Sequence, residues 1–433
     1  MERFLMDELI AWKDRPRRKP LILNGARQVG KTWLLKEFGR RCFDNVAYVN
    51  LDDNPGMREQ FGIGYDISRI ISAIQFETGQ TVSEGDTLVV LDEIQACPKA
   101  LTSLKYFCEN APGYAVAAAG SLLGITVHEG SGYPVGKVNT LDLHPLHFRE
   151  FLAATGNQSF CNLIESGDAD LINDFSGKLA PLLRQYYYVG GMPEAVDTFL
   201  ERGLLEDVRE VQLEILQGYE RDISKHLGRT ETEYTLAAWR SIPTHLGREN
   251  KKFVFSHIAE EARARNYRSG ITWLAQAGIT TVVRRISKPG IPLAPYADDA
   301  AFKLFLVDVG LLGAMAQLDK ETVIGGNGIF EEFKGSLTEQ YVCQQLVSDC
   351  GLTPYYWSAE NSSGEIDFLV QKQNSVFAIE VKAEENLRSK SLRAFKDSHP
   401  DVEAVRFSLS GYREQDWMRN VPLYAMVNME LWD

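Results

Sequence analysis

Eight consecutive residues near the start of the chain have the types and spacing of a phosphate-binding loop: residues 25–32 read GARQVGKT, which matches G-x-x-x-x-G-K-[ST] in full. Backbone N–H groups of such a loop curl around phosphate oxygens, and the helix that follows adds the partial positive charge of its N-terminus. In this pattern Lys31 reaches the β- and γ-phosphates, and Thr32 holds a magnesium ion. The expected contact residues are Gly25, Ala26, Arg27, Gln28, Val29, Gly30, Lys31, Thr32 and Trp33.

An acidic pair at the end of an apolar run would complete this chemistry. The run Leu88–Leu91 is followed directly by Asp92 and Glu93. We expect Asp92 to coordinate the magnesium ion through water, and Glu93 to polarise the water that attacks the terminal phosphate. The two motifs together predict binding and hydrolysis of ATP with Mg²⁺.

Ser121 is a third candidate for the same site. It ends the apolar stretch YAVAAAGS, residues 114–121. In AAA-type ATPases a polar residue at the tip of the strand between the two motif strands commonly contacts the γ-phosphate or the attacking water. The alternative is a plain turn at the end of a strand.

A second set of charged residues lies close to the carboxyl end, in the stretch GEIDFLVQKQNSVFAIEVKA, residues 364–383. Glu380 and Lys382 are two positions apart and share one face of a strand, and the adjacent strand can place Asp367 beside them. Two carboxylates can bind Mg²⁺ or Mn²⁺, while a lysine steadies the charge that develops on a phosphate. Glu339, on a predicted helix upstream, could project toward the same site.

This D…ExK arrangement with a preceding helical glutamate is the PD-(D/E)xK nuclease signature. It predicts Asp367, Glu380 and Lys382 as catalytic residues, and Glu339, Asp367 and Glu380 as metal ligands. The alternative is a nuclease-like fold without cleavage, whose charges pair as a buried ion cluster. Such a cluster would be costly if two acids faced a single lysine, so the sequence favours metal binding.

The elements that position these residues follow from the apolar runs. Five of them predict strands of a parallel sheet wrapped in helices: Leu21–Leu23, Val46–Leu51, Leu88–Leu91, residues 114–121 and Val138–Leu143. The predicted fold class is α/β, with an AAA-type P-loop sheet, a helical lid, a winged helix and a restriction-endonuclease-like α/β domain at the carboxyl end. The predicted boundaries are 1–155, 156–205, 206–322 and 323–433. Within the lid, the run of tyrosines at residues 186–188 is expected to pack in the core.

The predicted winged helix contains the one locally basic stretch of the chain. Residues 253–290 have the pattern of helix, turn, helix and β-hairpin wing. Basic residues gather in and around it: Arg248, Lys251, Lys252, Arg263, Arg265, Arg268, Arg284 and Arg285. Such a module could lay a helix in a groove of DNA or RNA. The alternative is a lid or a protein contact.

Bulk composition restricts the protein class. The chain has 433 residues, a net charge of −13 and a mean hydropathy of −0.21. The negative charge argues against coating nucleic acid with the whole surface. The absence of eighteen consecutive apolar residues, of an apolar leader and of paired CxxC cysteines favours a cytoplasmic protein with reduced thiols and no membrane partner. The expected partners are ATP, DNA or RNA, and further copies of the chain.

The order of several short motifs resembles a large family of bacterial and archaeal predicted ATPases. The matching strings are LNGARQVGKT, VVLDEIQ, GSLLG, HPLHFREFL, GGMPEAV, YERDISK, FKLFLVDVGLL and EIDFLVQ…AIEVKA. The family joins an AAA-type ATP-binding domain to a C-terminal domain of unknown function 4143. The resemblance implies an AAA core, a winged-helix segment and a restriction-endonuclease-like C-terminal domain.

One residue departs from the family pattern, and one residue is not assigned. Lys137 stands where the family has arginine, and a lysine would weaken a bidentate nucleotide contact at that position. Arg149, Arg184 and Arg221 are alternatives for an arginine finger. Two functions remain open: an ATP-driven nucleic-acid enzyme with a magnesium-dependent nuclease, and a nucleotide-dependent switch whose C-terminal domain only binds a partner.

Overall fold

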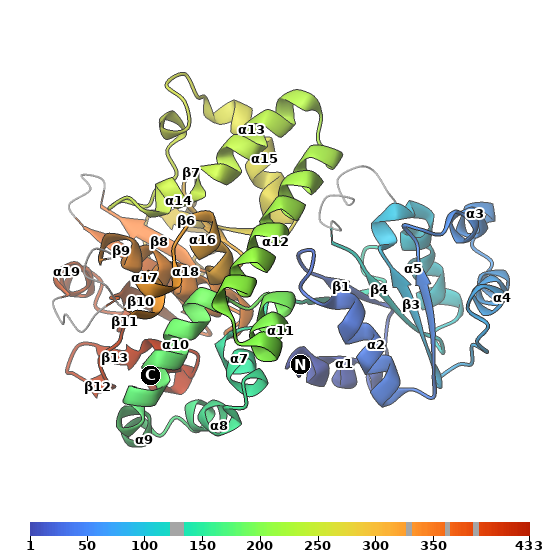
Figure 1. The fold of residues 1–433 in the computed structure, drawn as a ribbon, viewed down its shortest axis with the longest axis horizontal. Coiled ribbons are helices and arrows are strands. Elements are labelled where there is room, and N and C mark those ends of the chain that lie inside the picture. Colours follow the sequence, from blue (N-terminus) through green and yellow to red (C-terminus); the bar gives the residue numbers. More distant parts are fainter. Residues whose placement is uncertain (122–133, 326–330, 360–363, 384–388) are drawn as a thin grey trace. The chain divides into compact units, whose positions relative to one another are not determined.

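The computed structural model describes residues 1–121, 134–325, 331–359, 364–383 and 389–433 (Figure 1). The chain divides into two compact units. The smaller unit consists of residues 1–144 and 276–279, and the larger one of residues 145–275 and 280–433. No helix in the described ranges is long and apolar enough to cross a membrane.

The smaller unit is built on a five-stranded parallel sheet in the order β2-β3-β4-β1-β5. Its strands are β1 (Leu21–Asn24), β2 (Asn45–Asn50), β3 (Thr87–Asp92), β4 (Ala115–Ala119) and β5 (Asn139–Asp142). All five predicted strands are present, and β4 lies between β1 and β3, as predicted for the strand that leads to Ser121. The predicted parallel sheet is therefore confirmed.

Helices flank this sheet because apolar residues recur on one side of each. They are α1 (Leu5–Lys13), α2 (Lys31–Cys42), α3 (Pro55–Ile63), α4 (Ile67–Thr78) and α5 (Pro98–Asn110). Helix α2 buries Leu34, Leu35 and Phe38. A Cβ atom added at Gly39 would lie 2.4 Å from a methyl group of Val46, so glycine allows α2 to approach β2 closely.

The larger unit contains an eight-stranded mixed sheet in the order β12-β13-β11-β10-β9-β8-β6-β7. The strands are β6 (Thr280–Ile286), β7 (Ala297–Leu306), β8 (Tyr355–Ser358), β9 (Glu365–Lys372), β10 (Ser375–Val381), β11 (Glu403–Ser408), β12 (Arg413–Glu414) and β13 (Arg419–Pro422). The predicted hairpin of residues 364–383 is the antiparallel pair β9–β10.

The predicted wing is also a hairpin, but it does not stand apart from the rest of the unit. Strands β6 and β7 pair antiparallel, and β6 continues into the sheet through a parallel pairing with β8. Residues 322 and 323, the predicted boundary between the winged helix and the C-terminal domain, therefore fall within one compact unit. Pairing with β8 removes an exposed strand edge, which would otherwise leave backbone groups without partners.

Helices make up the remainder of the larger unit. They are α7 (Phe148–Ala154), α8 (Gln158–Ser166), α9 (Ala169–Asp174), α10 (Ser176–Val189), α11 (Pro193–Arg202), α12 (Leu205–His226), α13 (Arg229–Arg240), α14 (Ile242–Leu246), α15 (Ala264–Gln276), α16 (Val309–Met315), α17 (Lys320–Gly325), α18 (Glu331–Ser348) and α19 (Lys390–Ser398). The tyrosines at residues 186–188 in α10 are buried, so their predicted role in core packing is confirmed.

A buried carboxylate joins two of the short family motifs in this unit. Asp308, from FKLFLVDVGLL, is fully buried and caps α16 by accepting the N–H of Leu311 at 3.0 Å. Its other oxygen accepts the N–H of Gly191, from GGMPEAV, at 2.6 Å, and Gln344 of α18 donates to it at 3.2 Å. Asp308 therefore links these two motifs to each other and to α18.

Candidate functional site

The phosphate-binding loop has the backbone shape that its glycines permit. Gly30 has a φ of 94° and Gly25 a φ of 145°, conformations that favour glycine. A Cβ atom at Gly25 would lie 2.2 Å from the carbonyl oxygen of Leu143. Any larger residue at this position would push the loop away from Leu143, which directly follows β5.

Lys31 is held inside this loop. Its Nζ donates to the carbonyl oxygens of Gly25 and Ala26, at 2.8 and 2.7 Å. Burial lowers the pKa of Lys31 to about 8, and the charges of Glu93 and Asp92 only partly offset that effect. Its hydrogen-bond partners are neutral carbonyl groups, so phosphate oxygens could take their place at a gain in charge pairing.

The two motifs meet at a single carboxylate oxygen. Thr32 Oγ1 donates to Asp92 Oδ2 at 2.6 Å, and the hydroxyl of Tyr48 donates to the same oxygen at 2.9 Å. Thr32 lies in the first turn of α2, directly after the loop. Tyr48 and Asp92 lie on the paired strands β2 and β3. A hydroxyl and a carboxylate at this distance are a donor set that fits magnesium. Sequence reasoning did not identify Tyr48.

Glu93 occupies a left-handed backbone position, with a φ of 49°. Its carboxylate accepts a hydrogen bond from the side-chain amide of Gln95. Sequence reasoning also missed Gln95, although it belongs to the quoted motif VVLDEIQ. The structure therefore places next to Glu93 a neutral donor that orients it.

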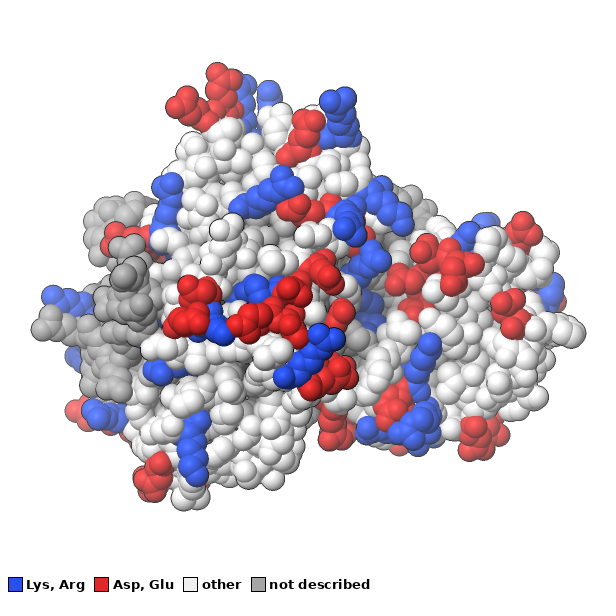
Figure 2. All heavy atoms as spheres, in the orientation of Figure 1, with Lys and Arg blue, Asp and Glu red and all other residues white. Residues whose placement is uncertain are grey.

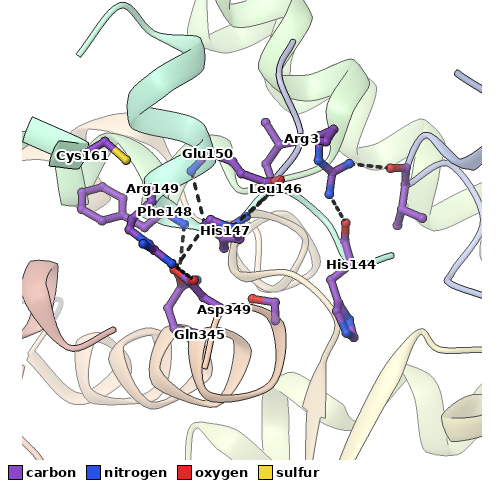
Figure 3. A network of polar contacts seen from close by, with 12 residues as sticks. Arg3, His144, Leu146, His147, Phe148, Arg149, Glu150, Cys161, Gln345 and Asp349 are labelled. Atoms are coloured by element: carbon purple, nitrogen blue, oxygen red, sulfur yellow. Dashed lines mark hydrogen bonds and ion pairs between the residues drawn. The ribbon is translucent and has the colours of Figure 1, made fainter. Parts of the chain in front are cut away.

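The remaining predicted nucleotide residues lie around the loop. Val29 is buried, and its carbonyl oxygen accepts from Arg3 at 3.0 Å; Arg3 also donates to the carbonyl oxygen of His144 at 2.6 Å (Figure 3). Trp33 is 45% exposed in the first turn of α2. Ser121 lies two residues after the end of β4, the strand between the two motif strands.

Lys137 and Arg149, two residues that the sequence offers for nucleotide contact, both have acidic partners. Lys137 forms an exposed ion pair with Glu109 of α5, at 2.9 Å. Arg149, one of the alternatives for an arginine finger, donates from Nε to Asp349 at 2.9 Å and from Nη1 to Glu165 at 2.9 Å. Burial by itself would lower the pKa of Arg149, but the bonds and charge of Asp349 outweigh it and raise the pKa.

The motif HPLHFREFL forms a polar network within the larger unit. Arg149 and His147 both point at Asp349, and His147 Nδ1 lies 3.2 Å from Asp349 Oδ2 (Figure 3). The N–H of Phe148 donates to Gln345 Oε1 at 3.0 Å. These contacts join the start of α7 to the end of α18, so Arg149 serves the packing of this unit.

The predicted nuclease residues fall into two groups. Glu380 Oε1 lies 3.1 Å from the Nζ of Lys382, and Arg406 is paired opposite Glu380 on β11. Same-face placement of Glu380 and Lys382 agrees with this contact. The positive charges of Lys382 and Arg406 therefore both act on Glu380.

Asp367 and Glu339 belong to the other group. Asp367 Oδ2 accepts the N–H of Val381 at 2.7 Å, and the charges that act on Asp367 are those of Glu339, Lys303 and Lys251. Burial and Glu339 raise the pKa of Asp367 to about 7. Burial alone would raise the pKa of Glu339, but Lys251 and Lys303 outweigh it and lower the pKa.

Metal binding at these acids stays a prediction. In the parts of the chain that the structure describes, no three histidine, cysteine, aspartate or glutamate side chains come together as a group that could hold a metal ion. Sequence reasoning treated Lys251 as part of a basic surface and did not identify Lys303 or Glu365. Glu365 could have been found locally, because it lies two residues before Asp367 on the same strand, whereas Lys303 lies on the distant strand β7 and gave no local signal.

The basic residues of the predicted wing are paired with acids. Arg284 donates to Asp299 at 2.7 Å, and Arg285 donates to Asp298 at 2.8 Å. Arg265 and Arg268 of α15 are exposed. On the face that Figure 2 shows, acidic and basic side chains lie interspersed over the larger unit.

Three family models match the chain. An AAA domain matches residues 17–152, a domain of unknown function (DUF8612) matches residues 180–322, and a domain of unknown function (DUF4143) matches residues 334–428. No curated protein matches the chain. The match at residues 17–152 covers the phosphate-binding loop and the acidic pair described above.

Several solved structures share a distant likeness. The Walker-type ATPase of Pyrococcus abyssi is 14% identical at a TM-score of 0.46, covering 73% of this chain and 95% of its own. The Aeropyrum pernix ORC1 protein in complex with DNA is 15% identical at a TM-score of 0.29, covering 75% of this chain and 94% of its own. These values are too low to carry an argument about activity. The parallel sheet, the two motifs and the family model that matches them identify an AAA-type P-loop domain at residues 17–152, while residues 180–322 and 334–428 match two domain families of unknown function.

Proposed function

We propose that this protein binds and hydrolyses ATP with Mg²⁺, and that its nucleotide state controls the binding of a partner by the larger unit. One observation carries the first part. The hydroxyl of Thr32 and the carboxylate of Asp92 are in direct contact, 2.6 Å apart, beside the lysine of the phosphate-binding loop. A neutral hydrogen-bonded pair could hold these two elements together at a lower desolvation cost than a buried carboxylate. The carboxylate of Asp92 is therefore better explained by a ligand than by packing.

Each residue of this site has a defined task in hydrolysis. Lys31 exchanges its carbonyl partners for phosphate oxygens, and Thr32 with Asp92 would hold the magnesium ion, which neutralises charge on the phosphates when it is bound. Glu93 orients and deprotonates the attacking water. Ser121, just after the strand between the motif strands, would contact the γ-phosphate or that water.

The second part of the proposal rests on the ion pairs of the larger unit. Glu339, Glu380, Arg284 and Arg285 all have partners of opposite charge. Catalytic acids and phosphate-binding arginines that are already paired must break those contacts before they can act. A unit that binds a partner and does not cleave it agrees better with these contacts.

A second candidate function is an ATP-driven, magnesium-dependent nuclease. The proximity of Glu380 and Lys382, with Asp367 hydrogen-bonded to the intervening residue Val381, supports it. Plasmid DNA and single-stranded RNA, incubated with Mg²⁺ or Mn²⁺ and with or without ATP, separate the two functions. The switch predicts ATP turnover with intact nucleic acid, and the nuclease predicts cleavage that Lys382→Ala removes.

A further inference from the structure

A fully buried lysine lies among the acids that the sequence assigns to a metal. Lys303 of β7 is 0% exposed, and its Nζ lies 2.5 Å from Glu365 Oε1 and 3.6 Å from Glu339 Oε2. Lys251, which follows α14, places its Nζ 2.6 Å from Glu339 Oε1. We call Lys251, Lys303, Glu339, Glu365 and Asp367 the lysine–acid cluster.

We propose that Lys251 and Lys303 take the place of a divalent cation in this cluster, so that Glu339 and Asp367 form a metal-independent ion cluster in the larger unit. The contacts of Glu339 carry the argument. Each of its two carboxylate oxygens already faces an ammonium group. A cation that bound Glu339 would have to lie next to both lysines.

The burial of Lys303 makes that arrangement unfavourable. An ammonium group with no exposed surface cannot turn away into water when a second cation arrives, and like charges that close repel strongly inside a protein. Lys303 also lies over the ring of Tyr356, with Nζ 5.1 Å from the ring centroid, which favours a cation at this position. The protein surroundings therefore keep the lysine charged and in place.

The third predicted ligand does not complete a metal site here. Glu380 is in contact with Lys382 and is paired opposite Arg406, and none of the contacts of the lysine–acid cluster involves it. Magnesium requires near-octahedral oxygen ligands. Glu339 and Asp367, the two predicted metal ligands in the cluster, do not fit that requirement, because an ammonium group lies beside each oxygen of Glu339.

The cluster has a positive task, which is to fix the segment around Lys251 to the sheet and to α18. Neighbouring contacts act in the same sense: Ser336 Oγ donates to the carbonyl of Leu246 at 2.6 Å, and the N–H of Phe253 donates to the carbonyl of Phe302 at 2.8 Å. Lys251 and Lys303 are thus positioning residues. They hold the segment before α15 against α18 and strand β9.

Manganese titration of the nucleotide-free protein, followed by electron paramagnetic resonance, tests the proposal. We expect identical titrations for the wild type, Glu339→Gln and Asp367→Asn. We also expect Lys303→Met to lower Tm by roughly 5 to 10 °C, because it leaves buried acids without a counter-charge. Adding Glu339→Gln to Lys303→Met should restore part of the loss, since it removes one of the two acids that Lys303 faced.

The matched control is Lys382→Met, which removes a lysine outside the cluster and should not respond to Glu339→Gln. Lys251→Met, at the more exposed end of the cluster, replaces Lys303→Met if the latter does not fold. A manganese site that is present in the wild type and lost in Glu339→Gln or Asp367→Asn would overturn the proposal. ATP turnover, measured on the same variants, reports separately on the proposed function, because none of these residues belongs to the nucleotide site.

Discussion

The nucleotide site of the smaller unit and the lysine–acid cluster of the larger unit both bury a lysine near carboxylates, yet the two lysines have opposite surroundings. Lys31 donates to two backbone carbonyls, and burial lowers its pKa to about 8. Burial by itself would lower the pKa of Lys303 as well, but Glu339 and Glu365 outweigh it and raise the pKa.

The charge of a lysine's hydrogen-bond partners distinguishes a ligand site from a structural ion cluster. A charged group whose partners are neutral gains a counter-charge when an anion binds, so it remains available to a ligand. A charged group whose partners already carry the opposite charge has nothing to gain from a further ion. By this criterion the phosphate-binding loop is prepared for a ligand, and the acids around Lys303 are not.

The largest expected effect is loss of nucleotide binding in Lys31→Ala. This change removes the side chain that reaches the β- and γ-phosphates, so affinity for ATP should fall by about a hundredfold or more, which corresponds to two buried charge-assisted contacts. Titration with a fluorescent ATP analogue measures it. Arg40→Ala, at an exposed position on the same helix, is the control and should retain binding.

Loss of turnover without loss of binding is expected for Glu93→Gln. The amide keeps the shape of the side chain and removes the base, so the rate should fall by roughly 10² to 10⁴-fold. Phosphate release under saturating ATP is the measurement. Hydrolysis at the wild-type rate would mean that another residue activates the water.

The affinity for ATP should depend on pH through Lys31. Its pKa of about 8 in the nucleotide-free protein means that the side chain becomes neutral as pH rises above 8. Bound phosphates favour the charged form, so ATP binding takes up a proton in that range, and affinity should fall by up to about tenfold per pH unit. An affinity that stays constant from pH 7 to 9.5 would contradict this assignment.

A smaller effect is expected at two pairs of arginines if the larger unit contacts nucleic acid. Arg265 and Arg268 are exposed, whereas Arg284 and Arg285 are paired with aspartates. Replacing Arg265 and Arg268 with alanine should reduce the salt dependence of DNA binding by about one unit of slope for each lost phosphate contact. The double alanine variant of Arg284 and Arg285 should change it less. A larger decrease in the Arg284 and Arg285 variant than in the Arg265 and Arg268 variant would indicate that the wing is the contact surface.

The smallest effect is expected at Gln95. Its amide holds the carboxylate of Glu93 through a neutral contact, so Gln95→Leu should change the rate of ATP hydrolysis only a few-fold, in line with one hydrogen bond of about 1 kcal/mol. The same phosphate-release assay measures it. A loss as large as that of Glu93→Gln would show that Gln95 is itself part of the catalytic machinery.

Much of the smaller unit could be predicted because its signals are local. Continuous apolar runs mark the buried parallel strands, and the glycines at positions 25 and 30 mark a loop that only a few backbone shapes allow. The two motifs lie at the carboxyl ends of β1 and β3, which are parallel strands separated only by β4, so predicting the strands also predicted that the motifs meet at one edge of the sheet. The hairpin β9–β10 was equally local, because its two strands are separated by a short turn.

Local patterns in the sequence were enough to predict the phosphate-binding loop, the acidic pair, the five strands of the smaller unit and the hairpin near the carboxyl end. Only the tertiary structure decided which charges meet in the larger unit. Lys251 reaches Glu339 across 88 positions of the chain, and the hairpin β6–β7 that carries Lys303 joins the same sheet as Asp367. Charge pairing depends on distance in space, and no pattern of neighbouring residues records which distant segments a sheet will bring together.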